Sequence, residues 1–213
     1  MTFLRNQSGL TYAIWTVLAI ELIAALITLR WTVAFVSLST LALSMAPPLL
    51  ASRLHIRLPR WVIAAVALFL FASLFLGEVL DFYERLWWWD IALHGLSALA
   101  LGFSGLLFVL ILFEGDRYAA PAWAMGLLAF SFAVSIGVLW EVFEFTMDHA
   151  FGFDMQRSGL MDTMGDLIVN VIGAGIAGIT GALYLRGQAL GSVAALFDEF
   201  VQLNRRFFKN FRR

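Results

Sequence analysis

Long runs of apolar residues dominate the chain, and short segments carrying most of the charged side chains separate them. A helix needs about 20 consecutive apolar residues to cross the hydrocarbon core of a bilayer. Because the connections are short, neighbouring helices should run antiparallel. The pattern therefore predicts an all-α polytopic membrane protein with six transmembrane helices, at Leu10–Leu29, Thr32–Leu50, Trp61–Leu80, Trp89–Phe113, Pro121–Met147 and Leu160–Leu185.

The segment that follows the sixth run has a different pattern. From about Gly191, apolar residues recur mostly at spacings of three and four, opposite a face that carries Arg205, Arg206 and Lys209. This pattern is typical of an amphipathic basic helix lying in the plane of the membrane. We expect a six-helix transmembrane domain over residues 1–187 and a cytoplasmic helix on the inner leaflet over residues 188–213. The alternative for this helix is a docking segment for a cytoplasmic partner.

Composition supports the membrane assignment. The chain is 62% hydrophobic and only 14% charged, whereas soluble domains carry about 25% charged residues. The absence of cysteine excludes disulfides, thiolate metal sites and cysteine nucleophiles. We expect membrane lipids as partners, no nucleic acid, and an oligomeric state that the sequence does not specify.

Basic residues are distributed unevenly between the two sides of the predicted bundle. The side opposite the termini would receive only Arg30, Arg85 and Arg157. The side of the termini would receive eleven: Arg5, Arg53, Arg57, Arg60, Arg117, Arg186, Arg205, Arg206, Lys209, Arg212 and Arg213. Since cytoplasmic loops are enriched in Lys and Arg, both termini should be cytoplasmic.

Ten of the fifteen carboxylates fall at the opposite side, mostly at the ends of the last four predicted helices. Carboxylates near lipid are costly and therefore indicate function. On each of these helices the polar residues are spaced by three or four, which places them on one face: Glu78 and Asp81; Asp90 and His94; Glu141, Glu144 and Asp148; Asp162, Asp166 and Asn170. We expect these faces to converge into one polar cavity that is open to the outside.

Carboxylates and an imidazole in one site are typical ligands of divalent cations. Oxygen ligands favour magnesium, calcium or manganese, and one histidine would admit zinc or iron. The predicted metal ligands are Asp90, His94, Glu141, Glu144, Asp162 and Asp166, with Asn170, Glu78, Asp81 and Asp148 supporting them. The first reaction class to consider is hydrolysis by a metal-activated water. Its predicted catalytic residues are His94, Asp90, Glu141 and Asp166, and its substrate would be lipid-linked or part of the envelope.

Other functions use the same residues. His94 could act as a general base oriented by Asp90, without a metal. The protein could be a proton- or cation-coupled transporter, although Leu96–Val109 offers only Ser97 and Ser104 as a polar path. It could also be a non-enzymatic scaffold whose polar network holds the helices together. Glu21 lies near the middle of the first predicted helix, and a partner such as Ser37 or Ser39 is expected.

The motifs together resemble those of a known family. Trp88-Trp89-Asp90-Ile91-Ala92-Leu93-His94-Gly95, Trp140-Glu141-Val142-Phe143-Glu144 and Asp162-Thr163-Met164-Gly165-Asp166, with Glu78, Asp81, Asn170 and Gly173, are similar to the YjdF-like family of bacterial inner-membrane proteins. The pattern is more distantly similar to the VanZ-like group, whose members are linked to glycopeptide-antibiotic resistance at the cell envelope. The resemblance implies a polytopic inner-membrane protein and supplies no reaction.

Overall fold

The computed structural model describes residues 7–116, 118–157, 159–188 and 191–211. Within these residues the chain forms eight α-helices, a π-helical segment and a short 3-10 turn, and no strand. Six helical segments are long and apolar enough to cross a membrane: Gly9–Ile27, Trp31–Arg53, Arg60–Val79, Trp89–Leu112, Ala122–Phe151 and Leu160–Leu185. They correspond one to one with the six predicted helices, so the all-α fold class is confirmed. The largest difference in bounds is the fifth, which continues past Met147 to Phe151.

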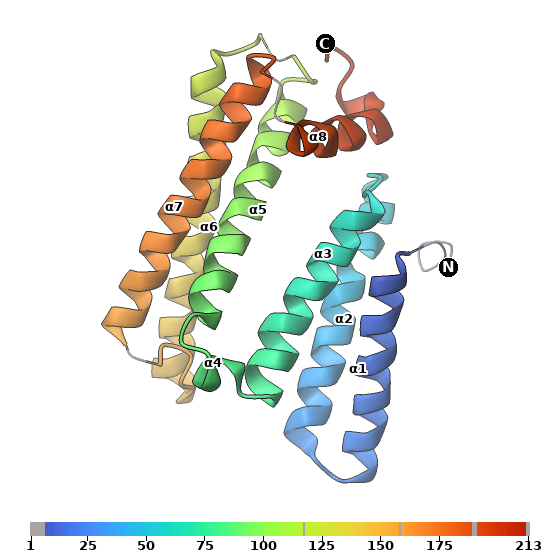
Figure 1. Cartoon of the computed structure of the whole chain (residues 1–213), viewed down its shortest axis with the longest axis vertical. Helices are drawn as coiled ribbons and strands as arrows, with labels where there is room; N and C mark the ends of the chain where they lie inside the picture. Colours follow the sequence, from blue (N-terminus) through green and yellow to red (C-terminus); the bar gives the residue numbers. More distant parts are fainter. Residues whose placement is uncertain (1–6, 117, 158, 189–190, 212–213) are drawn as a thin grey trace. The chain divides into compact units, whose positions relative to one another are not determined.

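The chain divides into two compact units, each of which is described by itself. Unit 1 comprises residues 1–89 with 202–204, and unit 2 comprises residues 90–201 with 205–213. Unit 1 contains α1 (Gly9–Ile27), α2 (Trp31–Arg53), α3 (Arg60–Leu70), the π-helical segment η2 (Phe71–Val79) and the one-turn helix α4 (Phe82–Arg85). In this unit α1, α2 and α3 lie side by side (Figure 1).

Interhelical packing in unit 1 combines an apolar cluster with buried hydroxyls. Ile14, Leu18, Ala67 and Phe75 form the apolar cluster. The indole Nε1 of Trp15 donates a 2.9 Å hydrogen bond to Ser44 Oγ and so links α1 to α2. Ser44 of α2 therefore takes part in interhelical packing, because in lipid a hydroxyl can be satisfied by a neighbouring helix.

Glu21 has a different partner from the one expected. Its Oε1 lies 2.8 Å from Arg30 Nη2, and Arg30 follows the end of α1. The long arginine side chain reaches back along the helix, which neutralises a carboxylate that lipid would otherwise penalise. The prediction of a serine partner on the second helix was wrong, since a charged partner in the connecting segment was within reach.

The third predicted span is not a uniform α-helix. Its second half is π-helical from Phe71 to Val79. The Phe71 and Phe75 rings stack with centroids 5.2 Å apart. Gly77 lies directly against the Tyr83 ring, so that a Cβ at position 77 would overlap it. The apolar pattern alone did not indicate this local change of helical pitch.

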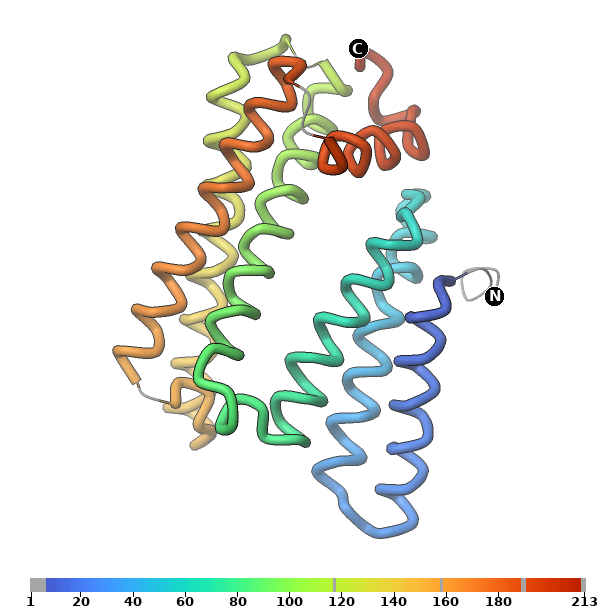
Figure 2. The backbone as a smooth tube through the Cα atoms, viewed as in Figure 1, coloured from blue at the N-terminus to red at the C-terminus, as the bar shows by residue number. Residues whose placement is uncertain are grey.

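Unit 2 is a three-helix bundle crossed by a shorter helix. It contains α5 (Trp89–Leu112), α6 (Ala122–Phe151), α7 (Leu160–Leu185), α8 (Ser192–Leu203) and the 3-10 turn η3 (Arg205–Phe207). The first residue of α5 and the last two of α8 are assigned to unit 1. The helices α5, α6 and α7 lie side by side and alternate in direction, as Figure 2 shows by following the chain. The predicted antiparallel arrangement is confirmed within this unit.

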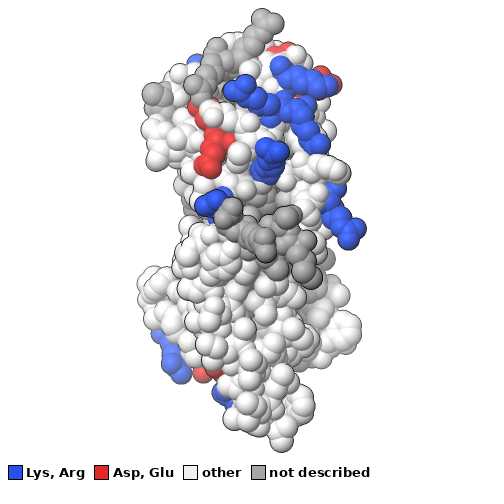
Figure 3. Space-filling model, turned by 90° about the vertical axis from the view of Figure 1, so that its right-hand side faces the viewer, with Lys and Arg blue, Asp and Glu red and all other residues white. Residues whose placement is uncertain are grey.

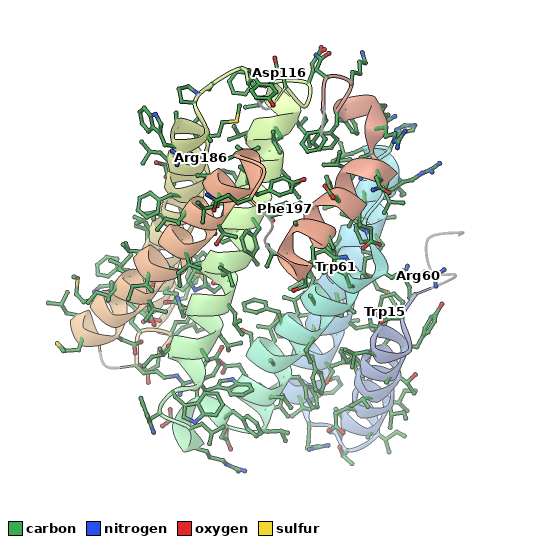
Figure 4. All side chains as sticks on the ribbon, turned by 45° about the horizontal axis from the view of Figure 1, so that its top comes forward. Trp15, Arg60, Trp61, Asp116, Arg186 and Phe197 are labelled. Carbon is green, nitrogen blue, oxygen red and sulfur yellow. The ribbon has the colours of Figure 1, made fainter. Side chains whose placement is uncertain are left out.

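The helix α8 packs on the transmembrane helices of unit 2 through aromatic rings. The Phe197 ring, labelled on α8 in Figure 4, lies 5.4 Å from that of Phe103 on α5 and 4.9 Å from that of Tyr184 on α7. Tyr184 Oη donates a 2.9 Å hydrogen bond to Asp198 Oδ1. Part of the apolar face of the predicted amphipathic helix therefore contacts protein. The helix ends at Leu203, ten residues before the end of the chain.

Charged side chains are sparse on the surface of the helices. Most of the face drawn in Figure 3 carries neither acidic nor basic side chains. Among the basic residues used for the orientation prediction, Arg5, Arg117, Arg212 and Arg213 lie outside the described residues. The orientation itself stays a prediction.

Candidate functional site

Three helices of unit 2 bring their acid-bearing ends together. The helices α5 and α7 begin, and α6 ends, at the same end of the bundle because consecutive helices alternate in direction. Asp90 and His94 lie four residues apart on α5, and Asp162 and Asp166 lie four apart on α7. This spacing places each pair on one helical face.

The residues Asp90, His94 and Asp166, here named the Asp–His–Asp group, form the tightest part of the site. One potential ligand atom from each lies within 4.8 Å of the others. His94 Nε2 is 3.6 Å from Asp90 Oδ1 and 3.9 Å from Asp166 Oδ2. These separations are too long for hydrogen bonds. They suit atoms that surround one cation, since bonds from common divalent metals to oxygen or nitrogen are about 2.0–2.6 Å long.

The group is shielded from solvent. The side chains of His94 and Asp166 are 10% and 4% exposed, and that of Asp90 is 29% exposed. Burying a carboxylate without a compensating charge is costly, and the cost is largest where water is excluded. A divalent cation would supply that charge.

Glu141 lies on the opposite side of the His94 ring. Its Oε1 is 3.8 Å from Nδ1, whereas the two aspartates face Nε2. The imidazole can thus offer Nε2 to a metal while its Nδ1–H faces a carboxylate, an arrangement that fixes the tautomer and orientation of metal-binding histidines. The geometry favours Glu141 as the partner of His94 over Glu141 as a ligand of the same ion.

The remaining acidic residues of the predicted ligand set lie at the edge of this group. Glu144 is buried, and its Oε1 accepts a 2.8 Å hydrogen bond from the Trp140 indole one turn earlier on α6. Asp162 is partly exposed and interacts electrostatically with Asp90 and His94. Arg157, in the loop before α7, interacts electrostatically with both Asp90 and Asp162. Neither Glu144 nor Asp162 belongs to the Asp–His–Asp group.

Asn170 lies one turn further along α7 from Asp166, against α6. It is 3% exposed. Its amide occupies the space beside Gly137 where a Cβ at position 137 would be. Gly137 is in turn one helical turn before Glu141. The sequence indicated Asn170 as a supporting residue, but it gave no signal for Gly137, because a glycine in an apolar helix has many explanations.

Small residues allow the three helices to approach closely around the site. A Cβ at Gly173 of α7 would lie 2.8 Å from the carbonyl oxygen of Gly95 on α5. One at Gly102 of α5 would overlap the Cβ of Ala177 on α7, and Gly126 and Gly178 face each other across α6 and α7. The small residues Gly173, Ala177 and Gly181, which are spaced by four on α7, therefore serve close packing between helices.

Most of the chain matches the sequence model of one protein family. Residues 10–187 match the model of the family described as "Predicted membrane protein (DUF2238)". The chain belongs to this family. The family assignment agrees with the resemblance to YjdF-like proteins, and it makes this chain a membrane protein with several apolar helices.

Comparisons with individual proteins add no function. The chain is similar to an uncharacterized protein of Thermotoga maritima, with 36% identity over 110 residues. The aligned part covers 50% of this chain and 56% of the relative, so the chain spans about half of that relative's length. No solved structure matches the chain.

Asp148, predicted as a supporting residue, fixes the loop that follows α6. Its two carboxylate oxygens accept 2.8 Å hydrogen bonds from the backbone N–H groups of Met155 and Gln156. The Gln156 side chain then donates a 2.6 Å hydrogen bond to Thr163 Oγ1 at the start of α7. Asp148 thus acts in this DUF2238 protein by holding the connection between α6 and α7.

Glu78 and Asp81 belong to unit 1, whereas the other predicted site residues belong to unit 2. Glu78 is exposed near the end of η2. Asp81 Oδ2 lies 3.5 Å from Arg85 Nη2 one turn along the chain. Their support of the site stays a prediction.

Proposed function

We propose that this DUF2238 family member binds a divalent cation through Asp90, His94 and Asp166 and acts as a metal-dependent hydrolase. The observation that carries the proposal is the Asp–His–Asp group itself, three potential ligand atoms within 4.8 Å of one another on two helices. Three protein ligands leave coordination positions for water and substrate, which is the arrangement of catalytic metal sites. Oxygen-rich ligation favours magnesium or manganese, and the imidazole also admits zinc or iron.

The position of the group supports a membrane-embedded substrate. Asp90 and His94 lie in the first two turns of α5, directly after three tryptophans. Tryptophan rings gather at the headgroup level of membranes. His94 would therefore lie about one helical turn below that level, within reach of a lipid-linked ester or of another envelope substrate. The distant VanZ-like resemblance, which also concerns the cell envelope, agrees with this proposal.

The proposal includes an inner-membrane protein with cytoplasmic termini and the site on the outer side. The chain has no cysteine, so single cysteines can report topology. We expect Asp154→Cys to react with a membrane-impermeant maleimide on intact cells. Lys209→Cys should react only after permeabilisation. Both positions are exposed, and the cysteine-free protein is the control. The reverse pattern of labelling would place the site on the cytoplasmic side.

A non-enzymatic scaffold makes a different prediction for stability. If the acidic residues only hold helices together, Asp166→Asn should lower the melting temperature. We expect the metal-free variant to melt higher than the wild type, because the amide removes the cost of burying a carboxylate. A gain of 1 kcal/mol would raise the midpoint by about 2–4 °C for a chain of this size.

The measurement is thermal unfolding in detergent with and without divalent metal. Wild type should melt higher with metal, since a ligand that binds only the folded state stabilises it by about 2.7 kcal/mol at 100 times its Kd. Asp166→Asn should lack that increase, while the exposed Asp154→Asn control should retain it. A lower melting point for Asp166→Asn in the absence of metal would support the scaffold.

A proton- or cation-coupled transporter needs a polar path through the remaining length of the helices. Ser97 Oγ and Ser104 Oγ of α5 donate to carbonyl oxygens of their own helix, those of His94 and Ala100. Glycine and alanine contacts fill the interfaces between α5, α6 and α7 below the site. These observations favour a site that opens to one side of the membrane. Uptake driven by a pH gradient in proteoliposomes would favour the transporter.

A further inference from the structure

Four buried polar atoms in or beside the Asp–His–Asp group make no hydrogen bond of good geometry, although the Thr163 side chain interacts with the Glu141 carboxylate. They are Glu141 Oε1, Glu141 Oε2, Asp166 Oδ2 and Asn170 Nδ2. The three residues are only 3–4% exposed. Leaving a buried polar group unsatisfied is costly, and native proteins satisfy nearly all such groups with protein, water or ions. Four such atoms in one place therefore indicate a polar ligand.

Side-chain direction brings these groups towards a common point. Side chains of an α-helix lean towards its N-terminus. Glu141 therefore leans over the turn of α6 that contains Gly137, and the Asn170 amide lies against Gly137 from α7. Asn170 leans back towards Asp166 on its own helix. Because α6 and α7 run antiparallel, the three side chains converge on one level of the interface.

The mixture of donor and acceptor atoms restricts the chemistry of this ligand. A bare cation would satisfy the carboxylate oxygens, but its charge would repel the amide N–H of Asn170. A water molecule accepts a hydrogen bond from an amide and donates to carboxylates. We propose that Asn170 and Glu141 bind an ordered water beside the metal position, in space that Gly137 provides. Asn170 Nδ2 donates to the water, and the water donates to Glu141.

This water gives Glu141 a role in the reaction, which rests on the proposed hydrolase function. The water oxygen would bond to the electrophilic carbon or phosphorus of an ester while its proton passes to Glu141. The bond from that centre to the leaving oxygen then breaks, and the leaving oxygen takes the proton back from Glu141. One ester and one water thus give one alcohol and one acid, and Glu141 returns to its initial state.

Asparagine labelling offers a direct test, because the chain contains only four asparagines, at positions 6, 170, 204 and 210. In metal-free protein labelled with 15N-asparagine, we expect a dipolar cross-peak between the Asn170 side-chain amide and a long-lived water. Asn204 is a matched internal control. It is equally buried. Its Oδ1 accepts a 2.8 Å hydrogen bond from the Arg57 backbone N–H, and its Nδ2 donates a 2.8 Å hydrogen bond to the Arg57 carbonyl oxygen. Its amide should show no such cross-peak.

Glycine variants separate the water from general packing. Gly137→Ala should abolish the Asn170 cross-peak, because its Cβ takes the place of the amide. Gly126→Ala adds comparable crowding on the same α6–α7 interface, against the carbonyl oxygen of Gly178, and should retain the cross-peak. Glu141→Leu should also abolish it and serves as the second variant if Gly137→Ala does not fold.

The outcomes are distinct from those of the metal proposal. A water cross-peak at Asn170 in a protein that binds no metal would support the proposed water site and contradict the proposed metal-dependent hydrolase. Metal binding without a water cross-peak at Asn170 would contradict the proposed water site. If Asn170→Leu weakens Mn²⁺ binding by tenfold or more, its amide oxygen is a metal ligand, and the water assignment is wrong. We expect a change in Mn²⁺ affinity below about tenfold, the lower limit for outer-shell partners of metal ligands.

Discussion

Replacing His94 with alanine should reduce divalent-metal affinity by at least about 100-fold, more than the 10–100-fold effect of losing an outer-shell partner. The expectation follows from the position of Nε2 between Asp90 and Asp166, at 3.6 and 3.9 Å. Without the imidazole, two carboxylates remain and the ion loses its nitrogen ligand. Asp166→Asn should have an effect of similar size, because it removes the charge of a buried ligand.

The measurement is the metal content of purified protein by elemental analysis, followed by calorimetric titration of metal-free samples. His149→Ala is the matched control: His149 is exposed on α6, and its Nδ1 lies 3.0 Å from the carbonyl oxygen of Phe145. We expect about one equivalent of metal in wild type and in this control. Equal and negligible metal in wild type, His94→Ala and Asp166→Asn would remove the metal-based proposal.

Adding a methyl group at Gly178 should destabilise the protein by about 1–3 kcal/mol, as overpacking usually does. A Cβ at this position would lie 2.7 Å from the Gly126 carbonyl oxygen and 3.2 Å from the Phe130 Cβ. Backbone atoms cannot rotate away, so α6 and α7 would have to separate. Gly178 lies about 18 Å along α7 from Asp166 by helical rise, so we expect a loss of stability while the Asp–His–Asp group keeps its geometry.

Gly175→Ala is the matched control for Gly178→Ala. Gly175 lies on the same helix, and nothing is found within 4 Å of a Cβ built on it. Alanine there should stabilise the helix by about 0.5–1 kcal/mol, because glycine in a helix interior is unfavourable. The two substitutions should therefore shift unfolding in detergent in opposite directions. Destabilisation of equal size at both positions would contradict the packing argument.

The hydrophobic pattern predicted the transmembrane helices well, and the reason is physical. Lipid offers no hydrogen-bond partners, so a crossing segment must be a helix of apolar residues, and such a run is visible without tertiary information. The two largest departures were local. The π-helical stretch at Phe71–Val79 and the short helix Phe82–Arg85 contain a stacked ring pair and the close contact of Gly77 with Tyr83, and neither contact changes the hydropathy of the segment.

The candidate site was predicted in composition but not in detail. Helical spacing correctly placed Asp90 with His94 and Asp162 with Asp166, because residues four apart share a face. Helical spacing could not show which acidic residues bind a ligand and which stabilise the local structure. Asp148 binds the backbone of Met155 and Gln156, and Glu144 accepts from Trp140. Both appear in the sequence as further acidic residues on the same face as Glu141.

The apolar pattern was sufficient to predict that this chain crosses a membrane, and helical spacing was sufficient to predict that acidic residues of α5, α6 and α7 lie at one end of those helices. Both facts follow from one-dimensional spacing and from the cost of charge in lipid. Which side-chain atoms lie together could be seen only in the packed helices. The aspartates facing one nitrogen of His94, Glu141 facing the other, and Asn170 against Gly137 all depend on how closely α5, α6 and α7 approach. That approach depends on pairs of small residues that meet between helices distant in sequence.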